Sequence, residues 1–254
     1  MNKPTILFLF NSSDHAPRPW LDDGRFNVVS VDYSETDHSG AHREPEAGHT
    51  VLNIDLAAED ALETVTEAIN ALYMAQPALV VSFAPCTDLA VSGAAHFDKK
   101  RERDPEFQNK AVRMAQLASQ FGCAYAVENP VSVLATLWRK PDMYWHPWEF
   151  SLYCPSGPHP EFPDVIPEDD WYNKKSCLWT GGGFILPRKT HSSGPVGVQN
   201  PGHMKLGGKS ARTKYIRSLT PRGFARAVYE ANCDEIMSKK WLTDTENFPI
   251  IRAQ

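Results

Sequence analysis

Residues 78–86 read ALVVSFAPC, a nearly unbroken apolar run that ends in Pro85 and Cys86. Such a run is typical of a strand that is buried on both faces of a parallel sheet. The proline ends the strand, so we expect Cys86 to lie just past its carboxyl end. Ligands of open parallel sheets bind at that edge. The segment therefore indicates a fold class and a candidate site together.

Four further segments have the same character: residues 5–10 (TILFLF), 25–33 (RFNVVSVDY), 50–56 (TVLNIDL) and 123–130 (CAYAVENP). Apolar side chains at spacings of three and four predict helices over residues 57–76 and 104–121. Strands that alternate with helices predict a Rossmann-like α/β fold, with a doubly wound and mostly parallel sheet. The predicted apolar faces are Leu62, Val65, Ile69 and Leu72 in the first helix, and Phe107, Ala111, Met114 and Leu117 in the second.

The pattern is weaker after residue 130. Residues 174–187 (KKSCLWTGGGFILP) predict a strand, a glycine turn and a second strand. Residues 220–241 predict a helix with Thr220 as its N-cap and Pro221 at its first position. We expect one domain over residues 1–254, with a cofactor and catalytic core at 1–140. A small, loop-rich insertion for substrate recognition follows at 141–215, and a C-terminal helix at 216–240 returns to the core.

Charge and cysteine content limit the classes of function. The net charge is −5, which disfavours a protein that coats duplex nucleic acid non-specifically. Residues 188–229 nevertheless hold nine Lys and Arg and no Asp or Glu, which fits either a solvated loop or a surface that faces phosphates. Five scattered cysteines without a CxxC pair predict neither a disulfide framework nor a zinc ribbon. We expect a cytoplasmic protein without a membrane segment and without a metal.

Cys86 and Glu128 are the candidate chemical pair, because both lie at predicted strand ends. A cysteine in such a turn can act as a nucleophile, although most cysteines are small, buried and inert. A carboxyl group on a neighbouring strand is then a candidate acid for a ring nitrogen, although a lone carboxylate is more often a surface charge. A cysteine–histidine hydrolase with His96 lacks an orienting acid. A zinc site of Cys154, His159 and Cys177 has no common spacing.

Four segments carry a family resemblance: APCTDLAVSGAAHF (residues 84–97), YAVENPVSVLATLWRKPD (125–142), NKKSCLWTGGGFILP (173–187) and RSLTPRGFARAVYEAN (217–232). The proline–cysteine pair and the Glu-Asn pair resemble motifs four and six of DNA cytosine carbon-5 methyltransferases. In order and length, the segments are most similar to the short, phage-encoded members of that family. The resemblance implies a methyltransferase-type Rossmann-like fold, with S-adenosylmethionine as cofactor.

The resemblance also implies roles for individual residues. Cys86 would attack carbon 6 of cytosine, and Glu128 would protonate or hold ring nitrogen 3. Asp32 would bind the ribose hydroxyls of the cofactor, and Asp55 its adenine amino group. The remaining cofactor-binding residues would be Phe10, Asn11, Ser12 and Pro85, and the remaining substrate-binding residues Asn129, Arg139, Lys140, Arg212 and Arg217.

The partner that the resemblance implies is DNA with a target cytosine. In duplex DNA that base must leave the stack before Cys86 can reach it. Two alternatives stay open. One is the same chemistry on a free cytosine nucleotide or on single-stranded nucleic acid. The other is a non-catalytic member of the family that binds the cofactor or nucleic acid, because the turn after residue 10 contains no glycine before Gly24.

Overall fold

A seven-stranded sheet with strand order β3-β2-β1-β4-β5-β7-β6 forms the centre of the protein. The computed structural model describes residues 3–11, 13–33, 48–73, 75–201, 205–207 and 210–239. Strands β1 to β5 pair in parallel, and β7 pairs antiparallel with both β5 and β6. The predicted Rossmann-like α/β fold with a mostly parallel sheet is confirmed. The strands are β1 (Thr5–Leu9), β2 (Asn27–Asp32), β3 (His49–Asn53), β4 (Pro77–Ser82), β5 (Ala124–Pro130), β6 (Met143–Trp145) and β7 (Ser176–Gly181).

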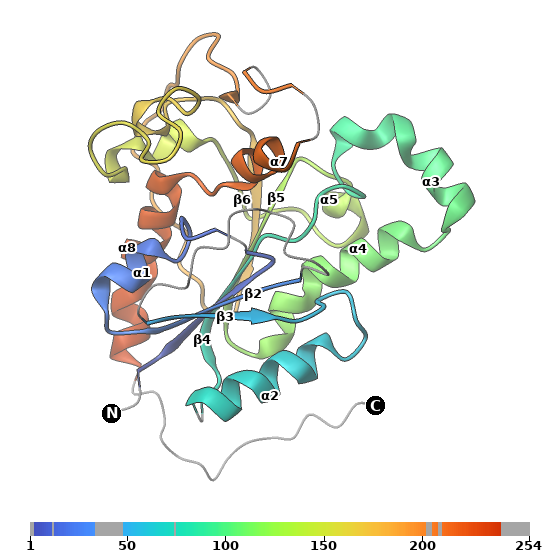
Figure 1. The fold of residues 1–254 in the computed structure, drawn as a ribbon, viewed down its shortest axis with the longest axis vertical. Coiled ribbons are helices and arrows are strands. Elements are labelled where there is room, and N and C mark those ends of the chain that lie inside the picture. The colour runs from blue at the N-terminus through green and yellow to red at the C-terminus, as the bar shows by residue number, and fades with distance from the viewer. Residues whose placement is uncertain are drawn as a thin grey trace.

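Helices cover both faces of the sheet, with α1 and α8 side by side at one flank and α2 and α4 at the other (Figure 1). The α-helices are α1 (Arg18–Asp23), α2 (Ala61–Tyr73), α3 (Phe97–Arg103), α4 (Phe107–Gln116), α5 (Leu134–Leu137), α7 (Ala211–Ser218) and α8 (Arg222–Ser238). The 3-10 segments are η1 (Val91–His96), η2 (Leu117–Phe121), η3 (Pro147–Tyr153) and η4 (Glu168–Asp170). Within the described residues, no helix is long and apolar enough to span a membrane.

The unbroken apolar character of β1 follows from its central position. Successive side chains of a strand point to opposite faces. Leu7 and Leu9 therefore pack towards α2 and α4, while Ile6 and Phe8 pack towards α1 and α8. All five residues of β1 are buried. No position of this strand faces water, so none of its side chains needs to carry a charge.

Helix α2 confirms the predicted amphipathic segment, but its apolar face is shorter than expected. Val65 and Ile69 are fully buried, whereas Leu72 is 51% exposed. The last turn of the helix is anchored by a polar contact instead, in which the Tyr73 hydroxyl lies 2.7 Å from Thr50 Oγ1. Leu72, the last residue of the predicted apolar face, therefore lies outside the core.

The predicted strand at residues 174–187 is confirmed in its first half as β7, and its second half is not a strand. Asn232 of α8 accepts a hydrogen bond from the Ile185 amide at 2.9 Å and donates one to the Ile185 carbonyl at 3.0 Å. The backbone groups that a strand would pair are thus satisfied by a helix side chain. Gly182 has a φ of 62° and packs on the Cys123 carbonyl so closely that a Cβ would clash with it.

The N-terminus of α8 differs from the prediction by one residue. Pro221, not Thr220, is the N-cap, and it provides no side-chain hydrogen bond. Asp170 supplies the cap from a distant loop, because its Oδ2 accepts from the Gly223 amide at 3.2 Å. Burial raises the pKa of Asp170, and the positive charge of Arg222 opposes that shift. The residue that caps this helix therefore comes from tertiary structure and not from the helix sequence.

The range 141–215, which we expected to form an insertion, contributes β6 and β7 to the sheet. Residues 165–172 of this range form a small apolar cluster with residues 216–219, at the end of α7. Its buried members are Val165, Ile166, Tyr172, Ile216 and Leu219.

Phe224 connects α8 to the far edge of the sheet. Its ring stacks on Trp145 of β6 at a centroid distance of 3.8 Å, and both side chains are almost completely buried. We expect Phe224→Ala to lower the free energy of unfolding by about 3–5 kcal/mol, because it leaves a large cavity and an unstacked indole. Urea denaturation measures this. Leu152→Ala is the control, since Leu152 is 72% exposed, and its effect should stay below about 0.5 kcal/mol. Equal losses in the two variants would contradict the packing described here.

Candidate functional site

The carboxyl ends of β4 and β5 lie side by side and carry the two candidate catalytic residues. Ser82 at the end of β4 is in register with Val127 of β5. Glu128 follows Val127 directly, and Cys86 lies four positions after Ser82 in a turn. Cys86 is exposed, as a nucleophile must be. The structure thus brings the two residues to the same edge of the sheet.

Hydrogen bonds hold the Cys86 turn against the segment that follows β5. The Cys86 carbonyl accepts from the Leu89 amide at 3.0 Å and from the Ala90 amide at 2.8 Å. The Val91 amide donates to the Val131 carbonyl at 3.2 Å, and the Val133 amide donates to the Leu89 carbonyl at 2.9 Å. These backbone contacts fix the position of the cysteine relative to β5.

Asn129, predicted to shape the pocket, ties the two strand ends together. Its side chain is 1% exposed, and its Nδ2 donates to the Ala84 carbonyl at 2.8 Å. Its Oδ1 is buried and has no hydrogen-bond partner within the described residues. Pro85, the next residue after Ala84, is exposed beside Cys86.

Glu128 has a buried carboxylate oxygen, Oε1, that lacks a hydrogen-bond partner in the described part of the chain. A buried acceptor without a donor is costly, and ligands commonly supply the missing donor. The charge of Glu128 also acts on its surroundings. Burial raises the pKa of Cys177 to about 11 with a further contribution from Glu128, and the pKa of Tyr172 is raised by burial, by the charge of Asp170 and to a smaller extent by Glu128. These two neighbours are therefore neutral near pH 7, and they do not compensate the carboxylate.

The thiol of Cys86 responds to the same charges. Although Cys86 is exposed, the protein around its thiol displaces part of the water and raises its pKa; the charge of Glu128 raises this pKa further, and the ammonium group of Lys174 lowers it. The thiolate is thus disfavoured while Glu128 is ionised. Glu128 and Lys174 control the nucleophile in opposite directions.

Lys174 was not among the predicted site residues. Ser176 of β7 is in register with Pro130, so the chain just before β7 continues past the end of β5. That antiparallel pairing is what brings Lys174 within electrostatic range of Cys86. In the sequence, Lys174 is visible only as one of two lysines that precede a predicted strand. Its proximity to Cys86 cannot be inferred until it is known that this strand pairs with β5.

Of the predicted cofactor-binding residues, Phe10, Asn11, Asp32 and Asp55 lie at or just past the ends of β1, β2 and β3, which are neighbours in the sheet, and Pro85 lies past the end of β4. Phe10 has a φ of 54°, so the chain turns sharply there without a glycine. Burial raises the pKa of Asp32, and within the described residues its carboxylate accepts only from the Tyr33 amide, at 2.9 Å. Asp55 is exposed and its Oδ1 accepts from the Ala57 amide at 2.9 Å. Ser12 lies outside the described residues.

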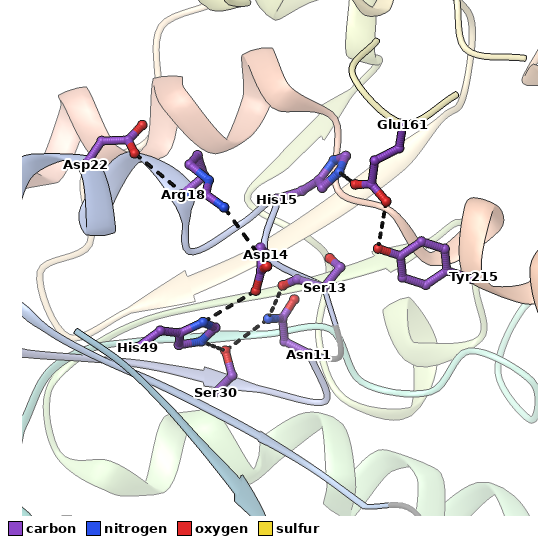
Figure 2. Close-up of polar contacts among 10 residues, drawn as sticks. All are labelled: Asn11, Ser13, Asp14, His15, Arg18, Asp22, Ser30, His49, Glu161 and Tyr215. Carbon is purple, nitrogen blue, oxygen red and sulfur yellow. Dashed lines mark hydrogen bonds and ion pairs between the residues drawn. The ribbon is translucent and has the colours of Figure 1, made fainter. Parts of the chain in front are cut away.

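A buried polar network supports the turn after β1 (Figure 2). Asn11 Nδ2 donates to the Ser13 carbonyl at 2.7 Å and to Ser30 Oγ at 3.1 Å. Ser30 Oγ also lies 2.9 Å from His49 Nε2, and His49 Nδ1 lies 3.4 Å from Asp14 Oδ1. The network links β1, β2, β3 and the start of α1, so the predicted role of Asn11 in cofactor binding would be exerted from within a rigid turn.

The predicted substrate-binding cations lie in two separate places. Arg139 is engaged in a structural contact, because its guanidinium donates to Asp142 at 2.9 Å and to the Thr180 carbonyl at 2.6 Å. Thr180 is in register with Ala126, on the amino-terminal side of Glu128. Lys140 is exposed beside it. The structure does not bring Arg139 to Cys86, and its role in substrate binding stays a prediction.

Arg212 and Arg217 both lie on α7. The Arg212 guanidinium lies 5.6 Å from the centre of the Phe162 ring and is exposed, so it remains accessible to a phosphate. Arg217 donates to the Leu206 carbonyl at 2.9 Å and is half-buried.

The three residues considered for zinc have other environments. Cys154 Sγ lies 3.7 Å from Asp170 Oδ2, His159 stacks on His15, and Cys177 is buried in β7. Among the residues that the structure describes, no group of three or more His, Cys, Asp or Glu could hold a metal ion.

Comparisons with known proteins were made at three levels. No family model matches the sequence, and no curated protein matches it significantly. Solved structures that match part of the chain include the Bordetella bronchiseptica enzyme WbmH, crystallised in complex with NAD+. The sequence identity is 18% and the TM-score 0.30, over 47% of this chain and 36% of that one. The matched region therefore spans about a third of the length of WbmH.

We expect Glu128→Gln to make Cys86 more reactive. Removing a negative charge lowers the pKa of the neighbouring thiol, and below that pKa each unit of decrease raises the thiolate fraction about tenfold. Lys174→Gln should have the opposite effect, because it removes the charge that favours the thiolate. Rates of alkylation by iodoacetamide at pH 7, with the modified cysteine located by mass spectrometry, measure both effects. Lys140→Gln is the matched control for Lys174→Gln and should leave the rate unchanged. Equal rates in all four proteins would show that the charges do not act on Cys86.

Proposed function

We propose that the protein is an S-adenosylmethionine-dependent methyltransferase that acts on carbon 5 of cytosine in DNA. The observation that carries this proposal is the buried, unpaired carboxylate oxygen of Glu128 beside an exposed cysteine at adjacent strand ends. A cytosine ring offers complementary groups to both residues, namely an electron-poor carbon 6 and a basic nitrogen 3.

The proposed reaction begins when the Cys86 thiol gives its proton to Glu128 and the resulting thiolate adds to carbon 6. As that bond forms, negative charge develops on the ring, and Glu128 in its acid form transfers its proton to nitrogen 3. Carbon 5 thereby becomes nucleophilic. S-adenosylmethionine supplies the methyl group that carbon 5 acquires. Water then takes the carbon 5 proton, the bond between carbon 6 and sulfur breaks so that Cys86 leaves as thiolate, and nitrogen 3 returns its proton to Glu128.

The electrostatics of the site favour this sequence. While Glu128 is ionised, its charge raises the pKa of Cys86. A hydrogen bond between protonated Glu128 and nitrogen 3 removes that charge at the moment when the thiolate is needed. Lys174 stays in place and favours the thiolate throughout. Binding of cytosine would thus activate the nucleophile, and the free enzyme would keep it as a thiol.

The residues at the ends of β1 to β3 fit the nucleoside part of the cofactor. Asp32 is a partly buried carboxylate with free acceptor capacity within the described residues, which suits the hydroxyl donors of a ribose. Asp55 is an exposed acceptor on the next strand and suits an amino group. The positive φ of Phe10 produces the sharp turn after β1 that a glycine commonly provides in other proteins. The antiparallel pair β7–β6 also sets this sheet apart from the order 3-2-1-4-5-6 of dinucleotide-binding sheets.

Nucleic acid as substrate is supported by the acid-free segment 188–229. Arg212 of that segment is exposed, and counterion release from a phosphate backbone would favour binding there. The target base would leave the stack and bind beside Cys86 at the edge of the sheet. In duplex DNA, unstacking and unpairing this base costs roughly a few kcal/mol.

The proposal predicts Cys86-dependent methyl transfer. Labelled S-adenosylmethionine is offered with duplex DNA, single-stranded DNA and dCMP in parallel, and label in the purified product is counted. We expect label in duplex DNA, its loss in Cys86→Ala, and a decrease of roughly 10²- to 10⁴-fold in Glu128→Gln. Cys123→Ala, which changes a cysteine outside the site, should retain full activity.

The pattern of label among the three substrates distinguishes the proposed function from its alternatives. Label only in dCMP or only in single-stranded DNA would replace duplex DNA as the substrate and keep the mechanism. Transfer that persists in Cys86→Ala would refute the covalent mechanism. The absence of both transfer and cofactor binding would favour a non-catalytic protein.

Cofactor binding is predicted to depend on Asp32. Asp32→Asn removes the charge that a pair of ribose hydroxyls would contact, and we expect roughly tenfold weaker binding of S-adenosylmethionine in calorimetry. Glu59→Gln removes an equal charge from an exposed position after β3 and is the control. Identical affinities for wild type and both variants would remove Asp32 from the cofactor site.

A further inference from the structure

A cavity of about 270 Å³ lies between α1, α8 and the loop around residues 155–161. Charged groups converge on it from all three sides. None of its lining residues belongs to the Cys86 site or to the predicted cofactor site. The lining is Asp14, His15, Arg18, Pro19, Asp22, Pro155, Pro160, Glu161, Arg222 and Arg226.

The acidic groups of this cavity are already compensated within the protein, as Figure 2 shows. Glu161 accepts from His15 Nε2 at 2.8 Å and from the Tyr215 hydroxyl at 3.3 Å. Asp14 lies 4.0 Å from the Arg18 guanidinium and also contacts His49. The side chain of Asp22 is 58% exposed, so water screens its charge.

Arg222 is the cation of the cavity with unused hydrogen-bonding capacity; its charge acts on the nearby buried carboxylate of Asp170, but the two side chains do not form an ion pair in the described part of the chain. Its Nε is buried and has no hydrogen-bond partner in the described part of the chain. Its Nη2 donates only a long bond, 3.5 Å, to the Gly157 carbonyl. No ion pair between Arg222 and a carboxylate is found among the described residues. A buried N–H of a guanidinium that is left unpaired is a costly feature unless a ligand satisfies it.

Two further groups surround the same space. The side chain of His15 is 8% exposed. Its Nε2 contacts Glu161, and its Nδ1 is buried without a hydrogen-bond partner within the described residues. Arg226 lies one helical turn after Arg222, so both guanidinium groups are on the same side of α8. Its bond to Glu230, at 2.7 Å, is at an exposed position where such pairs are weak.

We infer that this cavity binds a phosphate group, and that it is a second ligand site distinct from the Cys86 site. Arg222 would bind two phosphate oxygens through its planar fork, as arginine does in phosphate recognition. Arg226 and Arg18 would add positive charge at the rim. The group could belong to a nucleotide or to a nucleic-acid strand, and both present the same oxyanion. The inference rests on the cavity and not on the proposed methyl transfer.

The test is binding of four probes to the full chain: inorganic phosphate, deoxycytidine, dCMP and a short single-stranded oligonucleotide. Calorimetry gives affinities, and thermal unfolding gives the stabilisation that binding produces. We expect inorganic phosphate and dCMP to bind and deoxycytidine not to bind. Arg222→Gln should weaken phosphate binding roughly ten- to hundredfold, the loss expected for charge-assisted hydrogen bonds. An Arg222-dependent affinity that is higher for the oligonucleotide than for dCMP assigns the phosphate to a strand, and the reverse assigns it to a nucleotide.

Controls separate this site from general charge effects and from catalysis. Lys214→Gln removes an equal charge from an exposed position on α7 and should not change phosphate affinity. Cys86→Ala should also bind phosphate normally, so failure of the methyltransferase proposal would leave this result intact. Arg222→Lys keeps the charge and loses the fork, and it should bind with intermediate affinity even if Arg222→Gln does not fold. The inference is overturned if wild type binds no phosphate, or if wild type and both Arg222 variants bind it equally.

Discussion

The hydrogen bond from the Asn129 side chain to the Ala84 carbonyl fixes the relation between β4 and β5 beyond the point where their ladder ends. It is buried, so water does not compete for it. The Cys86 turn begins two residues after Ala84, and Glu128 directly precedes Asn129. A single amide thus places the nucleophile and the carboxylate on one rigid edge. The backbone contacts of residues 89–91 with residues 131–133 then close the same turn from its other side.

The turn after β1 shows how a close approach is possible without glycine. Phe10 adopts a left-handed φ of 54°, which is unfavourable for a bulky side chain and persists only where the surroundings impose it. Its side chain packs on the α2–α4 core, and Asn11 is held by Ser13 and Ser30. These contacts on both sides of the peptide supply the constraint. The absence of glycine in this turn, which favoured a non-catalytic protein at the level of sequence, is therefore compatible with a formed turn.

The parts of the fold that could be predicted are those fixed by local pattern. The five parallel strands and helices α2, α4 and α8 follow from apolar runs and helical spacing. Strand β6 has three residues, too few to show a period, and exists because β7 offers it a partner. The cap of α8 comes from Asp170, which is far from the helix in sequence. Cys86 and Glu128 could be predicted because they lie near the carboxyl ends of two strands with clear apolar patterns, whereas Lys174 and Arg222 acquire their surroundings through non-local packing.

The position of Glu128 also protects the exposed Cys86 from unwanted reactions. An accessible thiolate is oxidised and alkylated readily, so a nucleophile that is always ionised is at risk. Here partial burial and the Glu128 charge keep Cys86 in the thiol form, while Lys174 limits the size of that shift. A ligand that neutralises Glu128 removes one of the two effects that raise the pKa of Cys86, and the charge of Lys174 then opposes burial alone. The same carboxylate would thus protect the thiol in the free protein and, once protonated against a ring nitrogen, release it for reaction.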